Sequence, residues 1–463
     1  MELHILILLI ICLVAACGFE FVNGFHDTAN AVATVIYTNT LKPWVAVIWS
    51  AIWNALGVFA GGIAVAMSIV YLLPVETLID QNVYHSIAMV GALLISAIIW
   101  NLGTWYYGLP SSSSHTLIGS ILGVGIAYSL LPDSGYGAVN WAKAQDVGMS
   151  LLISPLFGFT LAILLMFLLR RFVKSKKLFT EPPKKKAPPT WIRSILILTC
   201  TLVSFFHGSN DGQKGVGLVM LILIGLVPTQ FALDSTKDPL KMPEELAKIE
   251  QVMQAVPVND LSAPQRESYA TVMKESAELH AVLDKAAING QLAARDRFII
   301  RKDILLISKN LDKVLKSDAN GLSSAQVKMA SAGLDGLKSY TDYAPFWVIV
   351  MIALSLGCGT MVGWKRIVKT IGEKIGKEHL TYAQGASAEL VAASTIGVST
   401  YLGLPVSTTH VLSSGIAGSM VANKGVKNLQ PKTVRAIALA WVLTLPVSIF
   451  LSGVLFLLFK ALL

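Results

Sequence analysis

Two short polar stretches, each inside a long apolar run, carry the residues in this chain that could do chemistry. The first covers residues 23–31 and contains Asp27, and the second covers residues 207–215 and contains Asp211. An ionised aspartate within a bilayer is costly unless it faces a partner or a water-filled cavity. A structural polar contact between helices is the simpler explanation for one such residue. Because the arrangement occurs twice, we expect Asp27 and Asp211 to belong to a binding site.

Both aspartates have polar neighbours at helical spacing. Asn30 follows Asp27 by three positions and Lys214 follows Asp211 by three, so each pair can project from one side of a helix. Lys214 could be a buried ion-pair partner of Asp211 or a substrate ligand, and both interpretations stay open. Histidines could add proton-dependent charge near neutral pH, although a lone buried histidine is more often a packing contact. Four histidines lie in these motifs: His26, His115, His207 and His410.

A second motif also occurs twice, as Gly-Leu-Pro at 108–110 and at 403–405, followed by hydroxyl residues and a histidine at the same offset. Proline suits the first turn of a helix, and the free N–H groups after it point beyond the helix end. A hydroxyl-lined helix end suits a tetrahedral oxyanion, whereas a single serine-rich turn is commonly only a cap. The hydroxyl residues are Ser111, Ser112, Ser113 and Ser114 in the first copy and Ser407, Thr408 and Thr409 in the second.

The spacing of the motifs indicates a duplicated unit with one insertion. Asp27 and His115 are 88 positions apart, and Asp211 and His410 are 199 apart. The excess of 111 is close to the length of a charged segment at 229–342, which has helical spacing of its charges. The predicted parts are a first membrane repeat at 1–173, a basic cytoplasmic linker at 174–193, a second membrane repeat at 194–228 and 343–463, and a helical extramembrane insertion at 229–342.

Composition predicts an all-α polytopic membrane protein. Of the 463 residues, 54% are hydrophobic and 14% are charged, and the mean hydropathy is +0.62. The net charge of +9 comes from short loops beside apolar spans, which argues against a nucleic-acid partner. Ten crossings are predicted, at 4–36, 44–73, 84–107, 111–131, 147–172, 194–228, 344–363, 381–402, 406–422 and 434–460.

Loop charges predict the orientation. The strongly basic segment 170–193 marks the cytoplasmic side, and the loops at 74–83 and 132–146 lack that excess and fall outside. Both termini and the insertion are then expected outside. About five crossings per repeat would make the repeats inverted, which is typical of transporters. Glycines in the two polar stretches predict helices broken near the middle of the membrane, at Gly24 and around Gly208.

Two aspartates beside an anion site repel the anion. Binding therefore requires compensation by protons, by sodium, by a divalent metal bound with the anion, or by Lys214. This requirement favours coupled transport, in which the cation loads before the anion is well held.

The paired motifs resemble those of the inorganic phosphate transporter (PiT) family, and in particular its bacterial low-affinity permeases. The resemblance covers nearly all membrane segments. It implies a multi-pass protein of the bacterial inner membrane that imports phosphate, free or as a divalent-metal complex. Arsenate has the geometry of phosphate, so we expect it as a further substrate. The resemblance further implies that phosphate and its coupling ion lie between the repeats, near Asp27, Asn30, Asp211, Ser112, Ser113, Ser114, Ser407, Thr408 and Thr409.

One position departs from the sodium-coupled members of that family. They carry Asn-Asp-x-Ala-Asn in both repeats, whereas the second repeat here has Lys214 at the last position. A fixed positive charge disfavours a nearby sodium ion, so we expect proton coupling. We expect no resident cofactor. The oligomeric state stays open, with a homodimer as one candidate.

The same residues could serve other functions. A sodium-coupled phosphate or sulfate transporter and a passive anion channel remain as alternatives, since a channel could also use helix ends and hydroxyls. An intramembrane hydrolase would need Ser114, His115 and Asp27 as a triad. Its base would be adjacent in sequence to its nucleophile, and the chain has no Gly-x-Ser-x-Gly elbow, so we do not expect an enzyme.

Overall fold

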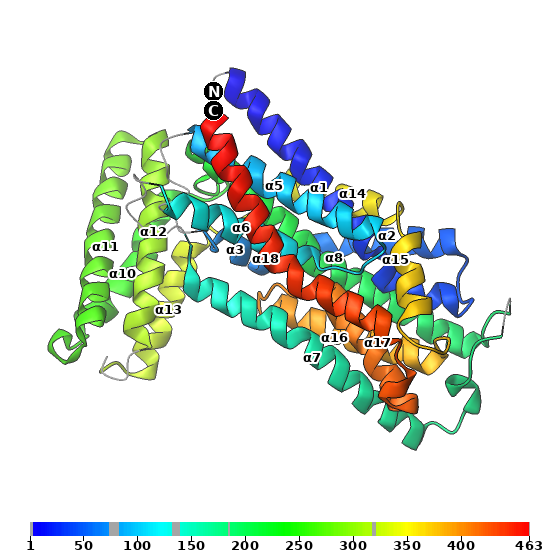
Figure 1. The fold of residues 1–463 in the computed structure, drawn as a ribbon. Coiled ribbons are helices and arrows are strands. Elements are labelled where there is room, and N and C mark those ends of the chain that lie inside the picture. The colour runs from blue at the N-terminus through cyan, green and yellow to red at the C-terminus, as the bar shows by residue number, and fades with distance from the viewer. Residues whose placement is uncertain (1–2, 74–82, 132–138, 184–185, 317–320, 463) are drawn as a thin grey trace. The chain divides into compact units, whose positions relative to one another are not determined.

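The computed structural model describes residues 3–73, 83–131, 139–183, 186–316 and 321–462. Within these ranges every regular element is a helix, apart from one isolated bridge between Gly376 and Leu429. The predicted all-α class is therefore confirmed. Contacts divide the chain into unit 1, made of Met1–Ile222 and Ala344–Leu463, and unit 2, Leu223–Tyr343 (Figure 1).

Unit 1 contains two similar series of helices. The first is α1 (Leu3–Tyr37), α2 (Pro43–Ala60), α3 (Ala64–Val70), α5 (Val83–Tyr106), α6 (Ser113–Ser129) and α7 (Trp141–Phe172). The second is α8 (Thr190–Leu226), α14 (Phe346–Thr360), α15 (Lys365–Lys369), α16 (Tyr382–Tyr401), α17 (Thr408–Lys424) and α18 (Pro431–Leu462). Lengths match in order: α6 and α17 have 17 residues each, and α7 and α18 have 32 each with one internal proline. This correspondence supports a duplicated unit, and the inverted relation of the copies stays a prediction.

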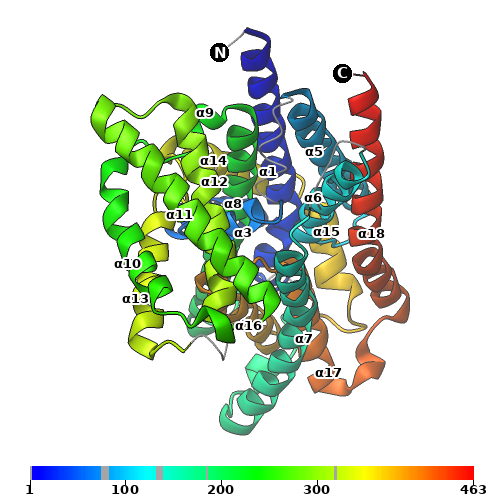
Figure 2. The same ribbon diagram turned by 90° about the vertical axis from the view of Figure 1, so that its left-hand side faces the viewer.

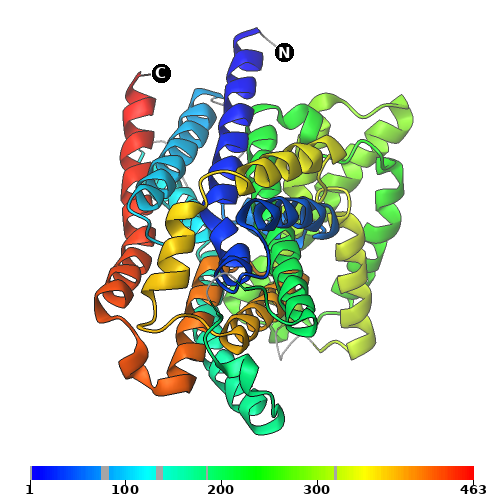
Figure 3. The same cartoon turned by 90° about the vertical axis from the view of Figure 1, so that its right-hand side faces the viewer.

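Ten crossings are more than the helix lengths support. Six helices in the described ranges are long and apolar enough to cross a membrane, or seven if α14 and the helical residues 365–374, bent by 54°, form one span. The 17 residues of α6 or α17 extend only about 26 Å, less than a hydrocarbon core of about 30 Å. The start of α1 and the end of α18 lie at the same end of unit 1 in Figures 1 and 3.

The predicted breaks in the two motif-bearing helices are absent. Both α1 and α8 run without interruption through their polar stretches. A glycine inside a helix costs only about 1 kcal/mol relative to alanine, whereas unpaired backbone groups in an apolar environment cost more. The breaks fall elsewhere, after α2 at Gly62 (φ +72°) and after α14 at Gly363 (φ +74°).

The glycines of the polar stretches instead allow close helix contacts. A Cβ on Gly24 of α1 would collide with the carbonyl of Leu356 in α14, and one on Gly208 of α8 with the carbonyl of Asn54 in α2. Such small residues let two helix backbones approach closely in a membrane. Each motif helix is thus held against a helix of the other series. The short helices also pack across the two series, since α6 packs on α18 and α17 packs on α7.

Unit 2 is the predicted helical insertion. Its main helices are α10 (Met242–Gln254), α11 (Ala263–Asn289), α12 (Ala294–Leu315) and α13 (Ser324–Lys338) (Figure 2). Their apolar faces form one buried cluster that includes Leu246, Leu279 and Ile304, as the helical charge spacing requires. Glu275, Glu278 and Asp303 lie together, and the Lys302 ammonium is within 3.4 to 3.7 Å of an oxygen of each. That lysine already supplies the cation for this acidic group.

Some of the residues on which the predicted membrane orientation rests lie outside the described ranges. They are residues 74–82 with Glu76 and Asp80, residues 132–138, and the pair Lys184 and Lys185.

Candidate functional site

The two predicted aspartates lie together in the interior of the protein, with a histidine between them. His207 Nε2 is 3.7 Å from Asp27 Oδ2 and 3.4 Å from Asp211 Oδ2. All three side chains are buried. Their ligand atoms lie within 4.8 Å of one another, so this group could hold a cation. His207 is oriented by its other ring nitrogen, Nδ1, which is 2.8 Å from Asn54 Oδ1 on α2.

Lys214 is buried beside Asp211 and fixes the second polar stretch. Its ammonium donates to Asp211 Oδ1 at 2.6 Å, to Ser114 Oγ at 2.5 Å and to the Val406 carbonyl at 2.7 Å. The first interaction is the ion pair that the spacing allowed. The other two join α8 to the starts of both short helices, so this lysine supports the geometry of the whole site as well as neutralising one carboxylate.

Both Gly-Leu-Pro motifs do lead into helix N-termini, but the prolines are not in the first turn. Helices α6 and α17 begin at Ser113 and Thr408, each three residues after the proline. Ser112 and Ser407 are the N-caps, and each accepts a hydrogen bond at 3.2 Å from the backbone N–H of the motif histidine. The prolines therefore lie in the segments that lead into these caps.

The hydroxyl groups at these two helix starts have different roles. Ser114 donates to the Val406 carbonyl at 2.9 Å, and Thr409 donates to Asp27 Oδ1 at 2.5 Å while it accepts from Asn30 Nδ2 at 3.0 Å. The hydroxyls of Ser113 and Thr408 are buried and have no hydrogen-bond partner. These two equivalent residues, the first of each helix, are therefore free to donate to a ligand.

The four predicted histidines separate into two kinds. His207 lies between the aspartates, and His26 Nδ1 is 3.3 Å from Asp27 Oδ1. His115 and His410 instead pack on each other with ring centroids 4.5 Å apart, and His410 stacks on Trp441 at 4.0 Å. The packing alternative thus describes His115 and His410 well.

Several contributors to this site were not expected from the sequence. Asn54 is the one amide residue in the apolar run of α2, and that pattern could have identified it. Asn210 stabilises the segment between α16 and α17. Its amide oxygen accepts from Val406 N at 3.3 Å, and its amide nitrogen donates to Thr400 Oγ1 at 3.0 Å. Because the Val406 carbonyl is a backbone group, no residue type could indicate its role.

Some buried polar atoms on these elements have no hydrogen-bond partner, namely Ser113 Oγ, Thr408 Oγ1 and Asn30 Oδ1. Asp211 Oδ2 and His207 Nε2 also lack a hydrogen bond, although they lie 3.4 Å apart as an ion pair. Buried polar atoms without partners are uncommon in folded proteins. The set mixes hydroxyl donors at two helix N-termini with carboxylate and amide acceptors. Such a set can hold an oxyanion together with a cation or a proton.

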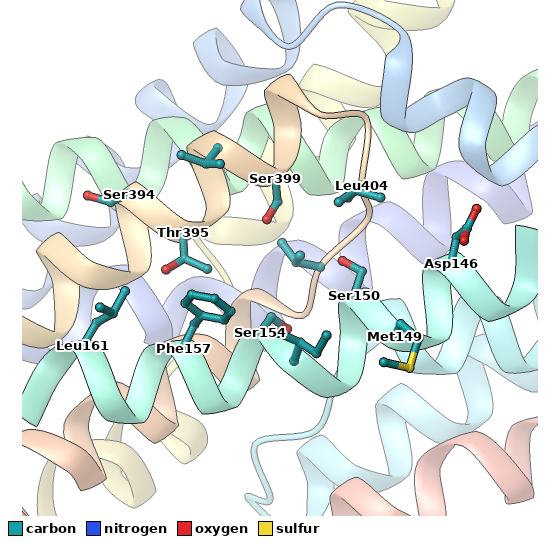
Figure 4. Close-up of a pocket in the computed structure, with 13 residues that line it drawn as sticks. Asp146, Met149, Ser150, Ser154, Phe157, Leu161, Ser394, Thr395, Ser399 and Leu404 are labelled. Atoms are coloured by element: carbon teal, nitrogen blue, oxygen red, sulfur yellow. The ribbon is translucent and has the colours of Figure 1, made fainter. Parts of the chain in front are cut away.

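One groove in unit 1 lies apart from the predicted site residues. It has a volume of about 600 Å³ and lies between α7 and α16, where Ser150, Phe157 and Thr395 face it (Figure 4). Phe157 and Val398 at this groove are largely exposed, as expected for side chains that face lipid. None of the predicted site residues lines it.

Comparisons with known proteins identify the family of this chain. The profile of the phosphate transporter family matches residues 23–452. The chain is 42% identical to the low-affinity inorganic phosphate transporter PitA of Escherichia coli (strain K12), covering 98% of this chain and 97% of that protein. It is 29% identical to a probable low-affinity inorganic phosphate transporter of Bacillus subtilis (strain 168), over 97% of this chain and 96% of that protein.

A solved structure shows that the fold is shared more widely. The structure described as the sodium-dependent phosphate transporter matches with a TM-score of 0.56 and 20% identity, covering 98% of this chain and 100% of that one. The family and its members are transporters, so the prediction that the chain is not an enzyme is confirmed. From its match over residues 23–452, this chain is a multi-pass membrane protein that belongs to the phosphate transporter family.

Proposed function

We propose that this chain imports inorganic phosphate in symport with protons across the bacterial inner membrane. The observation that carries the proposal is the pair of unpaired buried hydroxyls, Ser113 and Thr408, that begin α6 and α17. Their neighbours in sequence connect these helix starts to the aspartates, since Thr409 donates to Asp27 and Ser114 accepts from Lys214. In this proposal the two hydroxyls donate to the phosphate oxygens. Family membership supports phosphate as the substrate.

The carboxylates explain why phosphate should be preferred to sulfate. Near neutral pH phosphate keeps at least one O–H group, which can donate to Asp27 or Asp211, whereas sulfate has none. A site that accepts a substrate hydroxyl discriminates strongly against an analogue without it, since its own acceptors then stay unpaired. Arsenate has the shape and protons of phosphate and should enter by the same route.

The positive charge that an anion needs here comes from three sources. Lys214 contributes a permanent charge beside Asp211. Protons neutralise further negative charge. A divalent metal carried with phosphate as part of the substrate would fit Asp27, His207 and Asp211, whose ligand atoms are mutually within 4.8 Å.

Sodium coupling is the second candidate, since a structure of the same fold is described as sodium-dependent. The ammonium of Lys214 argues against it. That group lies 2.6 Å from Asp211 Oδ1, where a sodium ion would compete for the same carboxylate.

Reconstitution tests this proposal. Proteoliposomes with an alkaline interior should accumulate radiolabelled phosphate above the external concentration, with competition by arsenate and little by sulfate. Equilibration without accumulation would indicate a channel. Equal competition by sulfate would contradict the role of the carboxylates.

A further inference from the structure

Helix α1 carries a line of buried polar residues that extends beyond the site. Positions 20, 23, 27, 30 and 34 repeat at alternating intervals of three and four, so they share one face of the helix. The residues are Glu20, Asn23, Asp27, Asn30 and Thr34, and all are buried. The proposed site uses Asp27 and Asn30, and it leaves Glu20 and Asn23 without a role.

Glu20 is enclosed and incompletely paired. Its side chain is 0% exposed, Asn23 Nδ2 donates to Oε2 at 3.1 Å, and Oε1 has no hydrogen-bond partner. A structural carboxylate would normally be satisfied at both oxygens. An unpaired oxygen that is buried can instead carry a proton.

The carboxyl group of Glu20 faces α8 next to Lys214. A Cβ built on Gly215 would collide with it, so only glycine leaves room there. The charged groups that act on Glu20 are Asp211, His207 and Lys214, all on α8. Helix α14, which packs on this part of α1 at Gly24, has no acidic or basic side chain. Glu20 is two helical turns from Asp27, about 10 Å along the axis, so it influences the site through its charge.

We propose that Glu20 is the proton-carrying group that couples transport to the proton gradient. The inference rests on the proposed proton–phosphate symport. On the loading side Glu20 Oε1 takes one proton from water, and the O–H bond that forms removes one negative charge near Asp211. The anion is then better held. On the release side that O–H bond breaks, and the proton returns to water. Glu20 does not contact phosphate. It is therefore a positioning residue, which acts on the site through its charge.

The test compares two assays of Glu20→Gln in proteoliposomes. Glutamine resembles the protonated acid and keeps an oxygen for Asn23. Exchange of labelled for unlabelled phosphate without a gradient should therefore stay close to that of the native chain. Accumulation driven by a proton gradient should fall about 5- to 150-fold, the usual size of a coupling between two sites.

A matched control is available in α16. Glu389 is equally buried, accepts from Thr199 Oγ1 at 2.5 Å and has its other oxygen unpaired. Its neighbours are Thr199 on α8 and Thr34 on α1, and Asp211, His207 and Lys214, which act on Glu20, do not act on it. Glu389→Gln should therefore keep both exchange and accumulation.

The outcomes separate the two proposals. If the native chain shows neither exchange nor accumulation of phosphate, the proposed function is wrong. If the native chain accumulates phosphate and Glu20→Gln does too, or if the folded variant loses exchange as well, the role of Glu20 is overturned. Should Glu20→Gln not fold, Glu20→Asp keeps a protonatable group and should retain accumulation with a shifted pH profile; an unchanged profile would contradict the inference.

Discussion

The polar stretches of α1 and α8 occupy equivalent places in the two series of helices and have diverged in charge. In α1 the third residue after the aspartate is an amide, and Asp27 is held by a threonine hydroxyl and neighbouring histidines. In α8 the equivalent residue is Lys214, which pairs directly with Asp211. One half of the site thus carries a carboxylate without a fixed cation, and the other carries its own. The two halves therefore differ in whether a lysine three residues after the aspartate pairs with it.

The largest effect should come from removing either carboxylate. Asp27→Asn should abolish phosphate uptake, a loss of about 100-fold or more, because hydrogen bonds to charged groups contribute about 1.5–3 kcal/mol each. The protein should stay folded, since no fixed cation is left unpaired. Asp211→Asn should abolish uptake too and also destabilise the protein by about 3–5 kcal/mol, because it leaves the Lys214 charge without its partner.

The double variant Asp211→Asn with Lys214→Gln sharpens this contrast. It should recover thermal stability in detergent without recovering uptake. Near-normal uptake in both single variants would show that the aspartates are not the site. If Asp27→Asn and Asp211→Asn were equally stable, the proposed difference between the α1 and α8 halves of the site would be wrong.

A smaller effect is expected at the two free hydroxyls. Ser113→Ala and Thr408→Ala each remove one unpaired donor, so each should raise the KM for phosphate about 10-fold, with little change in stability. Ser112→Ala is the control, because loss of this N-cap should lower stability by about 1 kcal/mol. If Ser113→Ala left the KM unchanged and Thr408→Ala did not, the two helix starts would be unequal in binding.

The smallest effect on transport is expected at an aspartate–lysine pair outside the membrane unit. Burial raises the pKa of Asp303 in unit 2 to about 7, with Lys302 opposing that shift, against about 3.9 in an unfolded chain. Folding therefore takes up a proton, so the contribution of Asp303 to the stability of unit 2 should be fully present below about pH 4 and be lost as the pH rises through about 7.

Asp303→Asn should remove that pH dependence and leave phosphate uptake unchanged. Hydrogen exchange of the α11 and α12 amides in the full chain would measure the stability. Loss of uptake in this variant would show that unit 2 contributes to transport.

Much of the fold and the site follows from residue types and spacing. Polar residues repeated within apolar runs identified Asp27, Asp211 and the hydroxyl motifs, and helical charge spacing identified the insertion. The helix breaks were misplaced, because tertiary contacts at Gly24 and Gly208 decide that those glycines stay helical. The role of the Val406 carbonyl depends on a backbone position that only the folded chain defines. Asn54 contacts His207 over 153 positions, which spacing alone could not predict.

The most direct test of the contrast between the halves is phosphate uptake into proteoliposomes under a proton gradient or a sodium gradient, imposed separately, for the native chain and Lys214→Asn. We predict that the native chain accumulates phosphate under a proton gradient and that sodium has no effect on it. The variant should gain a dependence on sodium. Sodium-driven accumulation by the native chain would contradict the role assigned to Lys214.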